Sequence, residues 1–86
     1  MIGSPSFEQW RSAGKHVSYR QQPIFIVEHG SPGRGETLVC IHGFPTASWD
    51  WHAIWPALCK RFGYVIAPDL MGYGWSGKPL RWAVAR

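Results

Sequence analysis

Thr37-Leu38-Val39-Cys40-Ile41-His42-Gly43-Phe44-Pro45 is the stretch that decides the fold of this 86-residue chain. Residues 37–41 form an apolar run without polar alternation, which predicts a strand covered on both faces, as in a parallel sheet. The run ends in a His-Gly-Phe-Pro corner, and parallel sheets place ligand sites where their strands end. Gly43 lets the backbone approach a ligand closely, so the Phe44 N–H is expected to point into a cleft.

Two interpretations of this corner stay open on its four residues alone. A preorganised N–H aimed at developing negative charge contributes about 3–4 kcal/mol in acyl-transfer enzymes. The alternative is an ordinary turn from strand to helix. The Phe44–Pro45 bond is a candidate for the cis form, which is almost confined to X–Pro bonds. His42 has no carboxylate or cysteine at metal-ligand spacing, so we expect it to bond neighbouring backbone and hold the corner.

The elements after the corner predict a strand–helix–strand unit. Apolar residues at helical spacing predict a helix over about 53–61, after a separate turn at 47–51, with Ser48 or Asp50 as its cap. Residues 64–67 then form a second buried strand, so the order is that of a parallel βαβ crossover. The apolar positions of the helix are Trp51, Ile54, Trp55, Leu58 and Phe62.

The N-terminal part predicts an antiparallel hairpin. Residues 15–22 alternate loosely, residues 24–27 are β-branched and aromatic, and Gln21-Gln22-Pro23 is the expected turn. Residues 1–14 predict a short helical turn or an arm. The fold class is therefore α/β: an antiparallel hairpin followed by a parallel βαβ unit.

A glycine-rich loop at 69–79 matches three signatures, and none fits its surroundings. Residues 72–77 read GxGxxG, but the loop begins well after the strand, and the acidic residue that a dinucleotide site needs about 20 positions on falls outside the chain. Residues 72–78 read GxxxxGK, but Pro79 replaces the Mg²⁺-binding hydroxyl. Residues 74–78 resemble a GxSxG elbow, but a loop precedes Ser76. Asp69 is expected to order this loop through backbone N–H groups.

Composition excludes several classes of function. The formal charge is +4, but the basic residues are scattered, so we expect no nucleic-acid partner. Two cysteines without a CxxC motif predict free buried thiols. No signal peptide and no apolar run of about 20 residues is visible, which predicts a cytoplasmic protein without a membrane span. Charged residues make up only 16%, so apolar surface is expected to be covered by sequence beyond this chain.

Two blocks in this order resemble the α/β-hydrolase fold superfamily. They are Leu38 to Trp51, which contains HGFPTASWDW, and Ile66 to Pro79, which contains DLMGYGWSGKP. The resemblance covers residues 15–79 and is closest to the branch of epoxide hydrolases, haloalkane dehalogenases and mesoderm-specific-transcript-like proteins. It implies that the Phe44 N–H is one oxyanion-hole donor, in a corner shaped by His42, Gly43 and Pro45. It also implies a structural loop formed by Asp69, Gly72, Gly74 and Ser76.

The same resemblance implies an incomplete site. The family's nucleophile, acid and histidine lie downstream of the glycine loop, so residues 1–86 are interpreted as a partial domain that is inactive alone. The expected substrates of the parent are small molecules with ester, epoxide or carbon–halogen bonds, and no cofactor is required. Residues 80–86 do not look like the usual lead into the next helix, which suggests truncation or a frameshift. The alternative is a non-catalytic fragment that self-associates through exposed aromatic residues such as Trp51 and Trp55.

Overall fold

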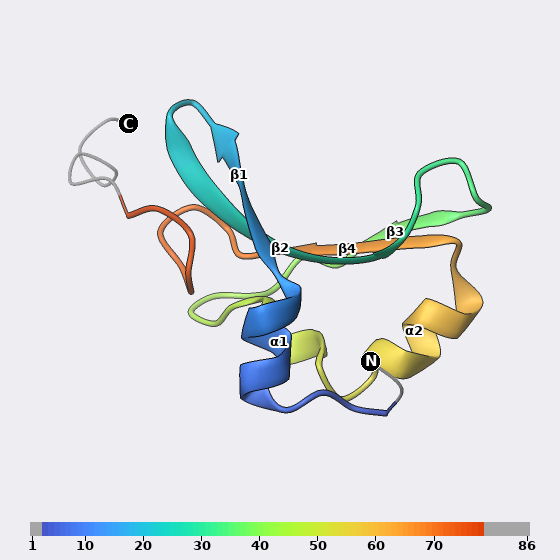
Figure 1. Ribbon diagram of the computed structural model, residues 1–86. Coiled ribbons are helices and arrows are strands. Elements are labelled where there is room, and N and C mark those ends of the chain that lie inside the picture. The colour runs from blue at the N-terminus through green and yellow to red at the C-terminus, as the bar shows by residue number, and fades with distance from the viewer. Residues whose placement is uncertain (1–2, 79–86) are drawn as a thin grey trace.

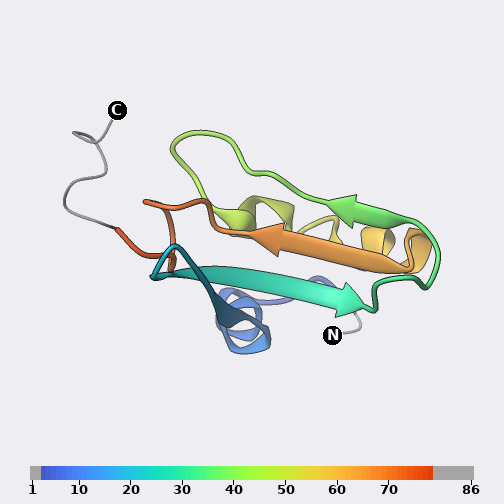
Figure 2. The same ribbon diagram turned by 90° about the horizontal axis from the view of Figure 1, so that it is seen from above.

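The computed structural model describes residues 3–78 as a four-stranded mixed sheet with its helices on one face (Figure 1). The strand order is β1-β2-β4-β3, in which β1, β2 and β4 pair antiparallel and β3 pairs parallel with β4 (Figure 2). The predicted hairpin and parallel crossover are therefore confirmed. The predicted atypical tail at 80–86 lies outside the described residues. The elements are α1 (Phe7–Ala13), β1 (Lys15–Tyr19), β2 (Gln22–Gly30), β3 (Thr37–Val39), the 3-10 helix η1 (Ser48–Trp51), α2 (Trp55–Arg61) and β4 (Tyr64–Pro68).

The hairpin turn lies one residue earlier than predicted. Arg20 and Gln21 form the connection, with φ angles of 49° and 67°. Positive φ at both central positions is the pattern of a type I′ turn, one of the two-residue turns whose backbone twist matches that of the strands. Pro23, expected in the turn, is instead part of β2 and lies opposite Ser18. The prediction was wrong because it used proline as a turn marker.

The crossover helix is shorter than predicted and has no side-chain cap. Its N-cap is Ile54, and Ser48 and Asp50 belong to η1 instead. Ser48 lies six residues before Ile54, inside η1, so its side chain is not at the capping position of α2. Ile54 itself is exposed, so its assignment to the apolar face was also wrong.

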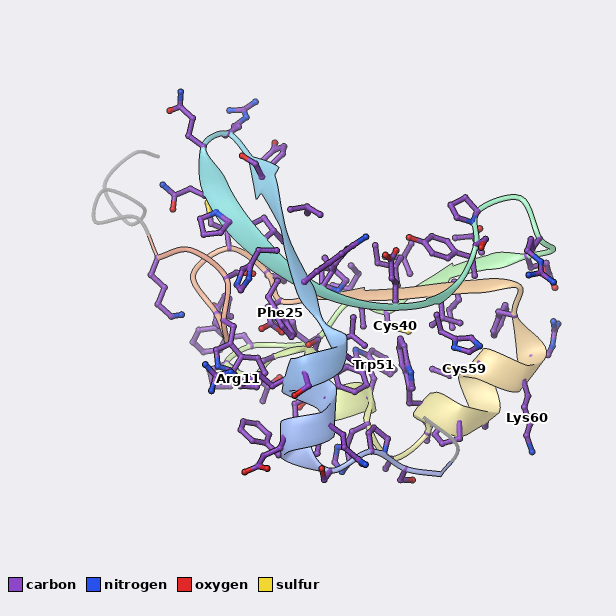
Figure 3. All side chains as sticks on the ribbon, in the orientation of Figure 1. Arg11, Phe25, Cys40, Trp51, Cys59 and Lys60 are labelled. Atoms are coloured by element: carbon purple, nitrogen blue, oxygen red, sulfur yellow. The ribbon has the colours of Figure 1, made fainter. Side chains whose placement is uncertain are left out.

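The hydrophobic core lies between the sheet and the helices. Its aromatic part is Trp10 from α1, Phe25 from β2 and Trp55 from α2, all buried. Figure 3 shows Phe25 and Cys40 on the helix side of the sheet, whereas Lys60 points away from it. Trp55 therefore cannot supply the exposed aromatic surface that the self-association hypothesis assigned to it. Smaller side chains complete the core, namely Val27, Cys40, Val65 and Ala67.

The opposite face of the sheet is open within residues 3–78. Val39 and Ile41 are 52% and 53% exposed, because α1, η1 and α2 all lie on the other side (Figure 1). The expectation that residues 37–41 are covered on both faces is therefore wrong for the part of the chain that the structure describes. Residues 37–41 are apolar on both faces of the strand, but residues 3–78 cover only one of these faces.

A polar cluster joins three strands on this open face. Lys15 Nζ of β1 lies 2.6 Å from Glu28 Oε1 of β2, and the Tyr64 hydroxyl of β4 donates to Glu28 Oε2. Hydrogen bonds from Lys15 and then from Tyr64 lower the pKa of the Glu28 carboxyl. The same bond to Glu28, followed by burial, raises the pKa of Tyr64. The two shifts show that the folded state favours the ionised Glu28 and the neutral Tyr64.

Glu28 is expected to make stability depend on pH on the acid side. Its stabilisation is present above the unfolded glutamate pKa of about 4.3 and is lost as pH falls through the lower folded value. Lys15 is well exposed, so the effect is at most about 1 kcal/mol. The free energy of unfolding, measured with urea between about pH 7 and pH 3, should fall less steeply toward acid pH for Glu28→Gln than for the parent chain. An identical fall in the unfolding free energy at acid pH for both chains would contradict this. Glu36→Gln is the matched control, because within residues 3–78 the Glu36 carboxylate makes only an exposed pair with Arg61.

Candidate functional site

The candidate site lies where β3 and β4 end. Both strands run in the same direction, so the segments that follow them leave at the same end of the sheet (Figure 2). The backbone pairing continues past β3, where the Cys40 N–H donates to Ile66 O at 2.8 Å. This bond fixes the start of the His42–Pro45 corner against β4. The Phe44–Pro45 bond is cis, as expected.

The Gly43–Phe44 peptide is held by its carbonyl. Gly43 O accepts from His42 Nδ1 at 2.7 Å and from the Thr46 N–H at 3.2 Å. The Thr46 hydroxyl is 3.1 Å away, but its single proton goes to the closer Asp50 carboxylate. A planar trans peptide points its N–H opposite to its C=O. The Phe44 N–H therefore points away from these donors, and within residues 3–78 it has no hydrogen-bond acceptor.

His42 connects the corner to the glycine loop. Its ring is buried, with 4% of its surface exposed, and its Nε2 lies 2.9 Å from the Leu70 backbone nitrogen. A backbone N–H can only donate, so Nε2 must be the unprotonated acceptor. The proton then sits on Nδ1, which donates it to Gly43 O. His42 is thus a neutral imidazole with both nitrogens used, and it has no free lone pair to act as a base.

The Asp69 carboxylate accepts hydrogen bonds from the glycine loop and from η1. Its side chain is fully buried, and Oδ1 accepts from the Ser48 N–H while Oδ2 accepts from the Trp75 N–H, both at 2.8 Å. Charge-assisted bonds of this kind are about twice as strong as neutral ones. Gly74 has φ +52°, and a Cβ there would lie 2.2 Å from Asp69 Oδ2. Only glycine therefore allows the loop to close around this carboxylate.

The Ser76 hydroxyl is buried and makes two hydrogen bonds inside the fold. It is 3% exposed, donates to Asp69 O at 2.5 Å and accepts from the Phe25 N–H at 2.8 Å. These bonds tie the loop to β2 and leave the oxygen no access to a substrate. Gly72, with φ +93°, closes the same loop through its N–H to Gly77 O at 2.8 Å.

The loop offers no phosphate site within the described residues. A phosphate-binding loop needs free backbone N–H groups, but Asp69 already accepts from Trp75. Lys78, the lysine of the GxxxxGK match, donates instead to the carbonyls of Gly74 and Ser76. The buried carboxylate occupies the place that an anion would take.

Neither the thiols nor the apolar hollow of the described residues adds a reactive group to the corner. Burial raises the pKa of the Cys40 and Cys59 thiols, which disfavours the reactive thiolate. Within residues 3–78, no three His, Cys, Asp or Glu side chains come together to hold a metal ion, and no helix has the length and apolar character of a membrane span. An apolar hollow of about 950 Å³ lies between the hairpin and the glycine loop, but Phe44 does not line it.

Sequence reasoning missed three contributors to the site. Leu70 supplies the N–H that sets the state of His42, and Ser48 supplies an N–H to Asp69. Tyr73 packs edge-on against both His42 and Phe44, with ring centroids 5.4 Å and 6.0 Å apart. Backbone donors carry no residue signature, so the first two were not predictable. The aromatic residue between Gly72 and Gly74 was visible but had no known neighbour.

Comparison with known proteins identifies the family. The model of the alpha/beta hydrolase fold family matches residues 36–85. The human mesoderm-specific transcript homolog protein is 46% identical over 77 residues, 88% of this chain and 23% of its own length. The soluble epoxide hydrolase of Corynebacterium sp. C12 is 48% identical over 66 residues, 74% of this chain and 23% of its own. The chain belongs to the α/β-hydrolase fold family.

The structural comparison agrees. The haloalkane dehalogenase DatA from Agrobacterium tumefaciens C58 superposes with a TM-score of 0.68 at 40% identity, over 78% of this chain and 22% of that one. The chain thus spans about a quarter of the length of these relatives, so it forms only a part of the α/β-hydrolase fold.

Proposed function

We propose that this chain is the N-terminal part of a hydrolase that cleaves ester, epoxide or carbon–halogen bonds. The Phe44 backbone N–H is one donor of its oxyanion hole or of the equivalent site. The observation that carries the proposal is the orientation of the Gly43–Phe44 peptide. Its carbonyl is bonded inward by His42 and Thr46, and its N–H has no acceptor within residues 3–78.

This arrangement suits stabilisation of a charge that appears only during reaction. A donor that is already oriented does not have to reorganise when the oxyanion forms, and removing one such donor costs about 10²–10³ in kcat. The support is threefold: the corner follows a parallel strand, His42 and Thr46 fix it, and relatives of the chain are named as epoxide hydrolases and haloalkane dehalogenases.

The chain alone is expected to give no turnover. Ser76 is buried and doubly bonded, and the raised pKa values of both thiols disfavour their thiolates. A panel of p-nitrophenyl esters, styrene oxide and 1-bromobutane should show only the uncatalysed rate with the 86-residue chain. Turnover that Ser76→Ala abolishes would reinstate Ser76 as the nucleophile, whereas turnover that survives this change would require another nucleophile in the chain.

A chimera tests the donor itself. Residues 15–78 replace the matching segment of the Corynebacterium soluble epoxide hydrolase, and the chimera is expected to hydrolyse epoxides. Replacing Phe44 by its α-hydroxy analogue converts the amide into an ester, which removes the N–H and keeps the side chain. This change should lower kcat by about 10²–10³ with little change in KM.

The matched control places the same amide-to-ester change at Gly33. Gly33 lies in the connection between β2 and β3. Figure 2 shows this connection at the end of the sheet opposite to the end where β3 and β4 finish. The kcat of the chimera with the ester at Gly33 should stay within about twofold of that of the unmodified chimera, because the Gly33 N–H is remote from the reacting atoms. Equal losses for the two esters would contradict the role of Phe44, since they would reflect only a weakened backbone.

A further inference from the structure

The Phe44 N–H lies at the end of a continuous chain of hydrogen bonds. The Leu70 N–H donates to His42 Nε2 at 2.9 Å, and His42 Nδ1–H donates to Gly43 O at 2.7 Å. Gly43 O and the Phe44 N–H belong to one conjugated peptide group. Every link donates in the same direction, from the glycine loop through the imidazole to the corner.

We propose that His42 is the positioning residue of the Phe44 donor, as a neutral Nδ1–H tautomer that transmits hydrogen-bond polarisation from Leu70 to the Gly43–Phe44 peptide. This rests on the function proposed above. Bonds in such a chain polarise one another, so a carbonyl that accepts a hydrogen bond makes its own peptide N–H a stronger donor. The imidazole sets both the direction and the strength of the donor without touching the substrate.

The surroundings of His42 favour a fixed ring. His42 is only 4% exposed, and the Tyr73 ring packs edge-on against the imidazole with ring centroids 5.4 Å apart. Tyr73 is itself held, because its N–H donates to Leu70 O at 2.9 Å. Leu70, which donates to His42, thus also holds the backbone of Tyr73, whose ring packs on His42. Rotation of the imidazole would break both of its bonds at once.

The tautomer can be measured on the unmodified 86-residue chain. Two-dimensional ¹H–¹⁵N spectra of the ring should show a protonated Nδ1 and an unprotonated Nε2 for His42. The opposite pattern, or the averaged pattern of a free imidazole, would overturn the proposal for this chain. No substrate is needed, so the result is independent of whether Phe44 acts in catalysis.

Two amide variants separate the two links, because each reproduces the position of one ring nitrogen only. The amide nitrogen of His42→Asn overlays Nδ1 and keeps the bond to Gly43 O, whereas the amide oxygen of His42→Gln overlays Nε2 and keeps the bond from Leu70. Leu70 amide exchange should accelerate about tenfold in His42→Asn and change little in His42→Gln. The Phe44 amide ¹⁵N shift, which responds to hydrogen bonding at the preceding carbonyl, should move in His42→Gln and hold in His42→Asn.

A purely structural role predicts a different outcome. If His42 only fills space, the two variants should move both reporters by similar amounts, and that result would overturn the proposal. His29→Asn is the control, because His29 is exposed on β2 and should change neither reporter. Failure of the chimera experiment with an intact Nδ1–H tautomer would instead reject the catalytic role of Phe44 and leave the hydrogen-bond chain in place.

Discussion

Asp69→Ala is expected to lower the free energy of unfolding by about 3–5 kcal/mol, because it leaves the Ser48 and Trp75 N–H groups buried without an acceptor. A domain of this size has a total stability near 5 kcal/mol, so much of the chain should be unfolded without denaturant. Urea unfolding followed by circular dichroism measures the loss. The free energy of unfolding of Asp69→Asn should lie between those of the parent chain and of Asp69→Ala. One side-chain oxygen of the asparagine still accepts, whereas its NH₂ group faces the other N–H donor.

Asp50→Ala is the matched control for this prediction. Asp50 is also a carboxylate next to the corner, but it is exposed, and among residues 3–78 it accepts only from the Thr46 hydroxyl. Its loss should cost less than about 1 kcal/mol. Equal costs for the two alanine variants would show that the buried carboxylate does not organise the loop, and the assignment of Asp69 as the organising residue would fail.

Trp10→Ala is the second change with a large expected effect, again about 3–5 kcal/mol. Trp10 is fully buried, packs edge-on against Trp55 with centroids 4.8 Å apart, and donates from Nε1 to Ser48 Oγ at 3.0 Å. Its removal opens a cavity and leaves the Ser48 hydroxyl without this donor. The urea midpoint should fall strongly with little change in slope.

Phe7→Ala tests whether the burial of Trp10 is the cause of the large loss of stability expected for Trp10→Ala. Phe7 lies on the same helix, and its ring centroid is 5.1 Å from those of Trp49 and Trp75, but it is 52% exposed. Its truncation should cost about 1 kcal/mol. A cost equal to that of Trp10→Ala would mean that α1 is held by its exposed aromatic contacts and not by its buried anchor.

The fold was predictable because its signals are local. The unbroken run at 37–41 indicated a parallel strand, and the β-branched run at 24–27 indicated a hairpin partner, both of which the structure confirms. The errors concern positions where a local preference is overruled. Pro23 lies in a strand, and Ser48 lies in η1, where its N–H donates to Asp69 and its hydroxyl accepts from Trp10. Sequence patterns cannot show such competition between distant partners.

The candidate site divides in the same way. Residue types alone indicated a corner at His42–Pro45 and a loop that depends on glycine, because an apolar strand followed by glycine and proline has few available conformations. Only the tertiary structure decided that Leu70 donates to His42, that the N–H donors to Asp69 are those of Ser48 and Trp75, and that Ser76 is sealed against β2. These contacts join residues far apart in the chain through backbone groups that every residue carries. Their partners are therefore set by how the strands and loops pack, and no pattern of side chains records them.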